Sequence, residues 1–254
     1  MKLWGTMTWG EIKLFLREPL TVVFAFAFPL VMLLVLAEVF GTAPSTEPAP
    51  GGELPWRGMP PLSAYVPGYI ALAAAAVGLI MIPAHLASYR ERGVLRRFRA
   101  ASIPASTIFA AQVAVEVVLS ALGGLLVVVA AYAIYDLAAP SDWLGAFVGF
   151  LFCIAAFAAV GVLLGAVMPS PRAAQGAGVL LFIVMLMLSG TGPPREVMTS
   201  TMNTIADLMP LSHGVQAIQD PWLGFGWNLT QLAILTAIAV VCGALATLAF
   251  RRQA

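Results

Sequence analysis

The sequence predicts an all-α integral membrane protein with six transmembrane helices. Hydrophobic residues make up 61% of its 254 residues and charged residues only 10%, whereas soluble domains carry about 25% charged residues. Apolar runs of about 20 residues, the length of helix that crosses a bilayer, recur along the chain with few charges inside them. The runs lack the alternation that spanning β-strands need, so we expect no β-barrel.

These runs divide one transmembrane domain, residues 1–254, into segments. The six spans are expected at about 20–40, 65–86, 107–135, 143–168, 173–189 and 228–250. The segments are an interfacial helix (1–19), spans 1 and 2 (20–86) with an outer loop (41–64), a cytoplasmic loop (87–106), spans 3 to 5 (107–191), an outer segment (192–226), and span 6 with the tail (227–254).

Residues 1–19 predict an amphipathic helix lying in the membrane interface. Its apolar side chains share one broad face: Trp4, Met7, Ile12, Phe15 and Leu16. The apolar run that follows is too long for a signal peptide and has no small-residue cleavage site, so we expect the first span to remain in the mature protein. Pro29 predicts a kink in that span. The loop at 41–64, rich in proline and glycine, cannot build a core.

The stretch "SYRERGVLRRFRAASIPAS" (88–106) places five arginines directly after the second span. Ser88 and Glu91 have the spacing of a capping box, which predicts a new helix from Tyr89. Three arginines would share one face of it and three apolar side chains another: Arg92, Arg96 and Arg99, against Val94, Leu95 and Phe98. Nucleic-acid binding is disfavoured, because topology already demands arginines at the membrane surface, where anionic lipid attracts them. Membrane anchoring and docking of a soluble partner remain, and the apolar face favours docking.

The outer segment, 192–226, predicts short helices that do not cross the membrane. Its apolar stripe recurs at four, three and four residues: Met198, Met202, Ile205 and Met209. Pro194 precedes this stripe and Pro210 ends it, so the helix is too short to span. We expect it to lie in, or dip into, the outer leaflet.

The distribution of basic residues sets the expected topology. Six spans place both termini on one side, and all of the 13 lysines and arginines except Arg57 and Arg195 fall on that side. By the positive-inside rule, both termini are cytoplasmic and the protein lies in the plasma or inner membrane.

The chain has few residues that could carry out catalysis. The only lysines are Lys2 and Lys13, and neither lies in a glycine-rich loop that could cradle a phosphate. His85 and His213 fall on opposite sides of the predicted membrane, so they cannot form a zinc site or a catalytic pair within one subunit. We expect no catalytic residue, no metal site and no cofactor in this chain.

Glu116 is the carboxylate predicted to lie deepest in the membrane. It lies about 15 Å into the third span, where an unpaired charge costs about 2.5 to 3.5 kcal/mol. Gln112, one turn earlier, offers a hydrogen-bond partner. Two interpretations stay open. Glu116 either lines a translocation path or a proton-linked site, or it forms a packing hydrogen bond or is reached by water from the cytoplasm.

Three patterns, taken in order, resemble the membrane subunit of a type-2 ABC (ABC-2) exporter, with the daunorubicin-resistance-type branch most similar. They are "LREPLTVVFAFAFPL" (16–30), "ERGVLRRFRAASIPAS" (91–106), and "SGTGPPREVM" (189–198) with "LMPLSHGVQAIQD" (208–220). The resemblance covers nearly the whole chain. It departs at Val94, where the family commonly has threonine.

The resemblance implies a permease that carries an apolar or amphiphilic cargo (drug, lipid or glycolipid) and is driven by a separate motor. Two permease subunits, identical or related, would pair with each other in the membrane lipid. Two ATP-binding subunits, which hold the ATP and Mg²⁺, would associate with this pair. The expected sites are ATPase coupling by Arg90, Glu91, Arg92, Gly93, Val94, Leu95, Phe98 and Arg99; a path lined by Phe24, Phe28, Glu116, Met185 and Met187; and an outer re-entrant gate of Met198, Met202, Ile205, Met209 and His213.

Two rival functions follow from the same residues. The first is a small membrane enzyme or assembly factor, in which Glu116, His85 and the loop arginines act on a lipid. The second is a proton-coupled carrier that uses Glu116. An ATP-binding partner distinguishes the exporter from both.

Overall fold

The computed structural model describes residues 19–44, 46–49, 52, 54–94, 97, 105–135 and 137–252, without the side chains of 21, 105–109, 251 and 252. The interfacial helix expected at 1–19 lies outside this range except for Pro19, and so do Leu95, Phe98 and Arg99. Every regular element in the described range is helical. Six helices are long and apolar enough to cross a membrane, which confirms the predicted fold class.

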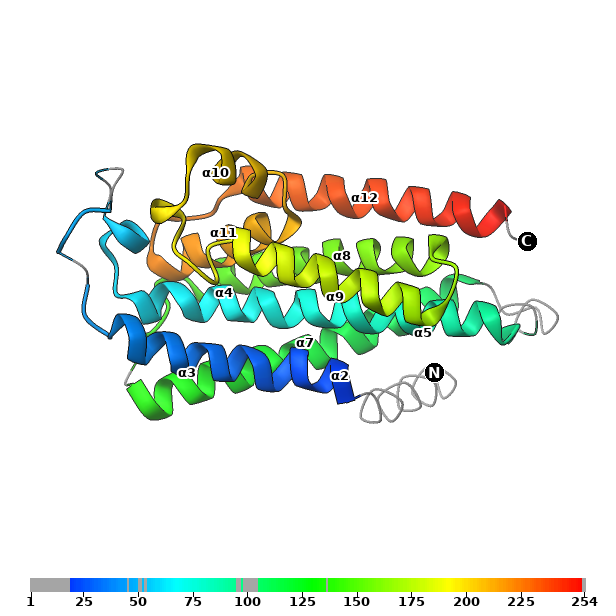
Figure 1. Cartoon of the computed structure of the whole chain (residues 1–254), viewed down its shortest axis with the longest axis horizontal. Helices are drawn as coiled ribbons and strands as arrows, with labels where there is room; N and C mark the ends of the chain where they lie inside the picture. The colour runs from blue at the N-terminus through cyan, green and yellow to red at the C-terminus, as the bar shows by residue number, and fades with distance from the viewer. Residues whose placement is uncertain are drawn as a thin grey trace.

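The spans have the following bounds in the structure (Figure 1). The first is α2 (Pro19–Val22), η1 (Val23–Ala27) and α3 (Phe28–Phe40), and the second is α4 (Pro61–Ala76), η3 (Val77–Met81) and α5 (Ile82–Glu91). The others are α7 (Ala105–Tyr135), α8 (Trp143–Val167), α9 (Pro171–Leu188) and α12 (Leu229–Arg252). The short helices are η2 (Pro55–Gly58), η4 (Arg195–Val197), α10 (Ser200–Ala206) and α11 (Pro210–Leu223).

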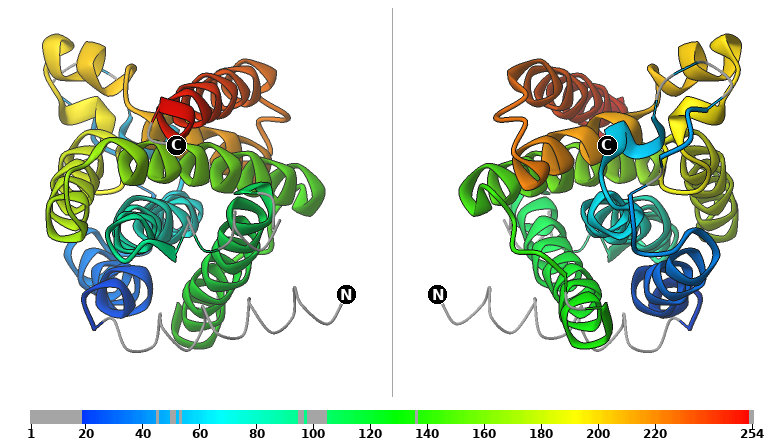
Figure 2. Two further views of the ribbon diagram at one scale, coloured as in Figure 1. Left: turned by 90° about the vertical axis from the view of Figure 1, so that its right-hand side faces the viewer. Right: turned by 90° about the vertical axis from the view of Figure 1, so that its left-hand side faces the viewer.

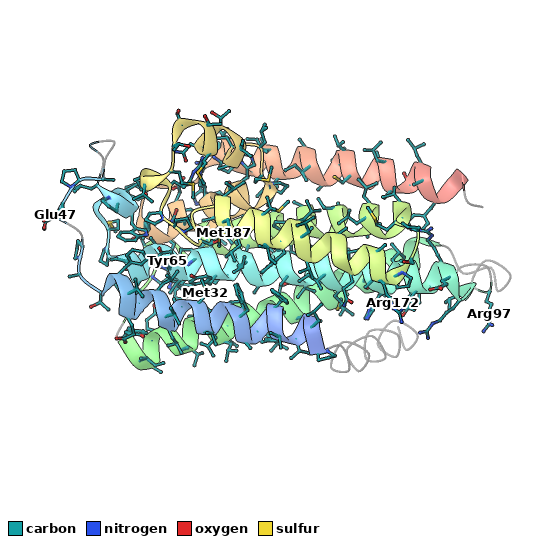
Figure 3. All side chains as sticks on the ribbon, viewed as in Figure 1. Met32, Glu47, Tyr65, Arg97, Arg172 and Met187 are labelled. Atoms are coloured by element: carbon teal, nitrogen blue, oxygen red, sulfur yellow. The ribbon has the colours of Figure 1, made fainter. Side chains whose placement is uncertain are left out.

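The two ends of the bundle differ in character. One end, called the basic end here, carries the end of α5 and the start of α9, and the side chains of Arg97 and Arg172 lie there (Figure 3). The opposite end, called the loop end, carries η2, α10 and Glu47 (Figures 1 and 3). The start of α2 and the end of α12 both lie at the basic end, as an even number of spans requires.

The second span is the centre of the bundle. The most apolar part of this span is entirely buried, whereas less than a third of the first, fifth and sixth spans is buried within the chain. It packs against α3, α7, α8, α9 and α11, which surround it in the views along the bundle (Figure 2). Hydropathy alone does not distinguish this core helix from the others, because all six spans are strongly apolar.

Glycines on two neighbouring helices allow this close packing. A Cβ added at Gly161 of α8 would overlap the carbonyl oxygen of Gly78, and one added at Gly178 of α9 would overlap that of Leu79. Both carbonyls belong to the π-helix η3. Small residues at helix interfaces in membranes let backbones approach in this way, so van der Waals contact replaces the missing hydrophobic driving force.

Both π-helices end two residues before a proline. η1 ends at Ala27 before Pro29, and η3 ends at Met81 before Pro83. A proline has no N–H for the carbonyl four residues earlier, and a local π-turn is one way in which a membrane helix adapts to that loss. Where the sequence predicts a kink in the first span, the structure therefore has a π-helix just before Pro29.

The capping box predicted at Ser88 and Glu91 is wrong. Ser88 lies inside α5, and its carbonyl accepts a helical hydrogen bond from the Arg92 N–H at 3.0 Å. The second span is longer than expected, so the backbone continues as helix through Ser88 instead of starting again at Tyr89. The break comes at Gly93, whose φ of +68° suits glycine, and the chain is helical again at Val94.

Asp142 ties the start of α8 to the segment before α12. Its carboxylate accepts from the Gly145 N–H at 2.9 Å and from the Trp227 indole N–H at 2.6 Å. These two donors, the Gly145 N–H first, hold the pKa of Asp142 below its ordinary value. Because the pKa is lower in the folded state, the stabilisation is present above the unfolded value of about 3.9 and is lost as the pH falls through the folded value.

We therefore expect Asp142→Asn to melt at a lower temperature than the parent protein at neutral pH, since an amide cannot accept at both positions. The difference should shrink as the pH falls below about 4. Thermal unfolding followed by intrinsic fluorescence across this pH range checks it. Trp227→Phe, which removes the indole donor, serves as the matched variant. A difference that stays constant with pH would contradict the assignment.

Candidate functional site

Spans 1 and 5 meet through an aromatic cluster. The rings of Phe24 and Phe28 lie 5.3 and 6.0 Å from the ring of Phe182 on α9, in edge-to-face geometry. The two phenylalanines predicted to line a path therefore contact each other and the fifth span. Phe182 was not predicted from the sequence, although it lies one turn before Met185 on the same helix.

The two methionines predicted for the path differ in environment. Met185 is buried within the chain, whereas Met187 is 43% exposed. Met187 shares the exposed side of α9 with Leu180, Ile183 and Val184. The first span also exposes apolar side chains, among them Val31 and Val35. Spans 1 and 5 thus carry both an internal contact and an exposed apolar surface.

Glu116 does not belong to this aromatic cluster. It is 0% exposed on α7 and faces the second span and α8, close to Gly78 and Phe157. Water from the basic end therefore does not reach it in this conformation. Gln112, Glu116 and Ser120 form a buried polar stripe at intervals of four residues, and their side-chain oxygen and nitrogen atoms have no hydrogen-bond partner in the described part of the chain. The hydrogen bond expected from Gln112 is not formed.

The segment between the last two spans folds back on the bundle at the loop end. Thr199 caps α10 by accepting the Met202 N–H at 3.3 Å. Met202 and Ile205 lie on α10 and are exposed, but Met198 precedes this helix and Met209 is the N-cap of α11. Only two of the four residues of the predicted stripe therefore lie on one helix, because α10 is shorter than the distance between the flanking prolines.

His213 faces the bundle and not the surface. It is buried on α11, and its Nδ1 lies 2.5 Å from the side-chain oxygen of Gln231 on α12. The amide nitrogen of Gln231 in turn donates to Gln216 at 2.6 Å. His213 thus helps hold α11 against the sixth span.

An ion pair that the sequence does not predict fixes the outer loop to α11. The Arg57 guanidinium donates to Asp220 at 2.6 Å and lies 3.6 Å from the centre of the Phe225 ring. Asp220 also accepts from the Asn228 amide at 2.8 Å. Trp56 and Arg57 have φ values of 51° and 58°, which non-glycine residues rarely adopt. The sequence feature that could have pointed to this ion pair is that Arg57 is one of two basic residues on the loop side of the predicted topology.

The second span holds the start of the same segment. The hydroxyls of Tyr65 and Tyr69 each donate to a backbone carbonyl, of Gly192 and Thr191 respectively, at 3.0 Å. Both tyrosines are buried and stack on each other. The outer segment is therefore attached to the most buried span.

At the basic end, Arg90 points into the protein. Its Nη1 donates to the carbonyls of Gly165, Ala166 and Met168 at 2.6, 2.7 and 3.0 Å, at the C-terminal end of α8. Of the other residues predicted for coupling, Glu91 and Arg92 are exposed, and Gly93 and Val94 are half-buried. Arg90 is thus a link between α5 and α8.

No group of three histidine, cysteine, aspartate or glutamate side chains that could hold a metal ion occurs among the described residues. Compared with known proteins, residues 2–223 match the family model described as ABC-2 type transporter. No curated protein matches the chain.

Proposed function

The chain belongs to the ABC-2 type transporter family, and on that premise we propose that it is the permease subunit of an ATP-driven exporter for an apolar or amphiphilic cargo. The matched family describes a membrane transport component and not an enzyme. The observation that carries the proposal is the combination of this match over most of the chain with six apolar spans.

The proposed path lies between two copies of the chain, or between the chain and a related one, along spans 1 and 5. Less than a third of each span is buried within the single chain, both spans expose apolar side chains, and they meet at Phe24, Phe28 and Phe182. Phenylalanine and methionine side chains suit varied apolar cargo, because thioethers and aromatic rings repack around different shapes. Glu116 is proposed as a packing residue, since it faces the second span and α8 and not this surface.

The proposed docking site for the ATP-binding subunits is the loop 87–106 at the basic end, which faces the cytoplasm in this proposal. The helix break at Gly93 supports it, because the break lets the chain turn and start a second helical segment at Val94. Glu91 and Arg92 are exposed beside the break. ATP and Mg²⁺ belong to the partner.

The test is Leu95→Asp, with affinity capture of the ATP-binding subunit after co-expression and ATP-driven export in vesicles. We expect at least a tenfold loss of capture and of export, because a carboxylate would be desolvated on the proposed apolar face. Glu91→Lys and Gly93→Val extend the series. Leu54→Asp is the matched control, since Leu54 is an exposed leucine at the loop end.

If Leu95→Asp leaves capture of the ATP-binding subunit and export unaltered, the loop 87–106 is not the docking site. Transport that needs no ATP would contradict the proposed function as an ATP-driven exporter and would favour a proton-coupled carrier.

A further inference from the structure

A cavity of about 640 Å³, called the outer cavity here, lies at the loop end between η2 and the outer segment. Trp56 and Arg57 of η2 form one part of its wall. Uncharged polar side chains from the end of α9 to α11 contribute to the rest of the wall: Ser189, Ser200, Asn203, Gln216 and Gln219. A cavity of this size with polar groups in its wall has room for several water molecules. The side of η2 that faces the cavity is therefore not close-packed against the outer segment.

The helix α11 is the fixed side of the outer cavity. The Gln219 amide nitrogen donates to the Ala64 carbonyl of α4 at 3.1 Å, which joins α11 to the second span. The backbone N–H of Ser141, just before α8, donates to the Trp222 carbonyl of α11 at 3.0 Å. Asp220, between these two contacts, thus lies on a helix that is bound both to the second span and to the segment before the fourth.

The backbone of η2 is strained. Trp56 has φ 51° and ψ 30°, and Arg57 has φ 58° and ψ 30°, which is the left-handed region that non-glycine residues rarely adopt. The N–H groups of Arg57 and Met59 donate to the carbonyls of Leu54 and Trp56, so these backbone hydrogen bonds stay within the loop. Residues in such a conformation persist where surrounding contacts hold them, and they are frequent in switch regions. Side-chain contacts to other elements therefore hold η2 in place.

The Arg57 side chain crosses from the strained turn to the fixed helix. Its guanidinium donates to Oδ1 of Asp220 at 2.6 Å and lies 3.6 Å from the centre of the Phe225 ring. The Arg57 side chain is 47% exposed, so water can solvate it as soon as it leaves Asp220. Asp220 would keep a partner, because its Oδ2 accepts from the Asn228 amide at 2.8 Å. Breaking this ion pair thus leaves both charges solvated or hydrogen-bonded and lets η2 relax.

We propose that η2 is a lid on the outer cavity and that the Arg57–Asp220 ion pair is the latch that holds it closed. When the latch opens, η2 adopts an unstrained backbone and moves away from α11, and the cavity becomes accessible from the loop end. The lid deepens the proposed function, on which its role in export rests, because it would control access to the outer segment. Opening itself needs neither ATP nor a partner subunit.

The experiment measures opening of the lid by chemical labelling of the purified chain in phosphatidylcholine nanodiscs. Ser189→Cys places a thiol in the wall of the outer cavity, at a position that is only 3% exposed. A bulky sulfonated maleimide should reach this thiol only when η2 moves away, so the labelling rate follows the open fraction. We expect Arg57→Gln to raise the rate about tenfold, the scale of one hydrogen bond to a charged group. Cys153 and Cys242 lie on α8 and α12, and the chain without the new cysteine gives the background rate.

Two controls separate the latch from a general loosening of the loop end. Ser200 is exposed in the same wall, so labelling of Ser200→Cys should not respond to Arg57→Gln. Glu196→Gln removes a charge from the wall and leaves the Arg57–Asp220 ion pair in place. Raising the salt concentration from about 0.1 M to about 1 M shortens the Debye length from about 10 Å to about 3 Å. Relative to Ser200→Cys, this should speed labelling of Ser189→Cys, but not once Arg57→Gln is present.

Equal labelling of Ser189→Cys with and without Arg57→Gln would overturn the proposal, and so would an equal rise in rate with Glu196→Gln. ATP-driven export is measured separately in vesicles that contain the ATP-binding subunit. If export depends on ATP but labelling does not respond to Arg57→Gln, η2 is not a latched lid and the exporter proposal stands. If labelling responds but transport needs no ATP, the lid stands and the exporter proposal is wrong.

Discussion

Replacing Gly178 with alanine is expected to destabilise the protein by about 3 kcal/mol, the upper part of the usual range for overpacking. The added methyl group would overlap the Leu79 carbonyl oxygen and lie 2.8 Å from the Leu79 carbonyl carbon. These are backbone atoms of the buried second span, which has neighbours on all sides and cannot move away. Helices α9 and η3 would have to separate, and their other contacts would be lost.

Gly176 provides a matched control on the same helix. A Cβ at Gly176 meets nothing within 4 Å, and the residue is exposed. Gly176→Ala should therefore melt at the parent temperature or slightly above it, because alanine is the better helix former by about 1 kcal/mol. Thermal unfolding of the purified proteins in detergent compares the two variants. Equal melting temperatures for Gly178→Ala and Gly176→Ala would show that α9 does not pack on η3 this closely.

The second large effect is expected for Arg90→Met, which keeps the apolar stem of the side chain and removes its donors. Three carbonyls at the C-terminal end of α8 would lose their partner: those of Gly165, Ala166 and Met168. Carbonyls in the last turn of a helix have no N–H of the same helix to accept from, and they lie at the negative end of the helix dipole. We expect a loss of about 2 kcal/mol in the free energy of unfolding, typical of a hydrogen bond to a charged group.

Arg92→Met is the control, since Arg92 is exposed just after the end of α5. Melting of the isolated permease in detergent measures the structural effect, because no ATP-binding subunit is present. If Arg90→Met melts like Arg92→Met but loses affinity capture of that subunit, the main role of Arg90 is docking and not capping of α8. This measurement separates the two roles that one arginine could have at the basic end.

The candidate site was only partly predictable from sequence. Phe24 and Phe28 were singled out, but their partner Phe182 was not, because hydropathy does not say which faces of two spans meet. Arg57 stood out as a cation on the sparsely charged side, yet nothing in the sequence paired it with Asp220, 163 residues away. Arg90 was grouped with the exposed arginines of its loop, since a charge pattern does not show that one side chain turns inward.

The sequence by itself determined the fold class and the number of spans, because the cost of placing polar groups in hydrocarbon shows directly in composition and run length. The tertiary structure decided which span is central, what glycines such as Gly178 are for, and that Glu116 is fully buried. These features depend on contacts between helices that are all apolar. Such helices differ in the shape of the faces they present to each other, and that shape is defined only when the neighbouring helix is in place.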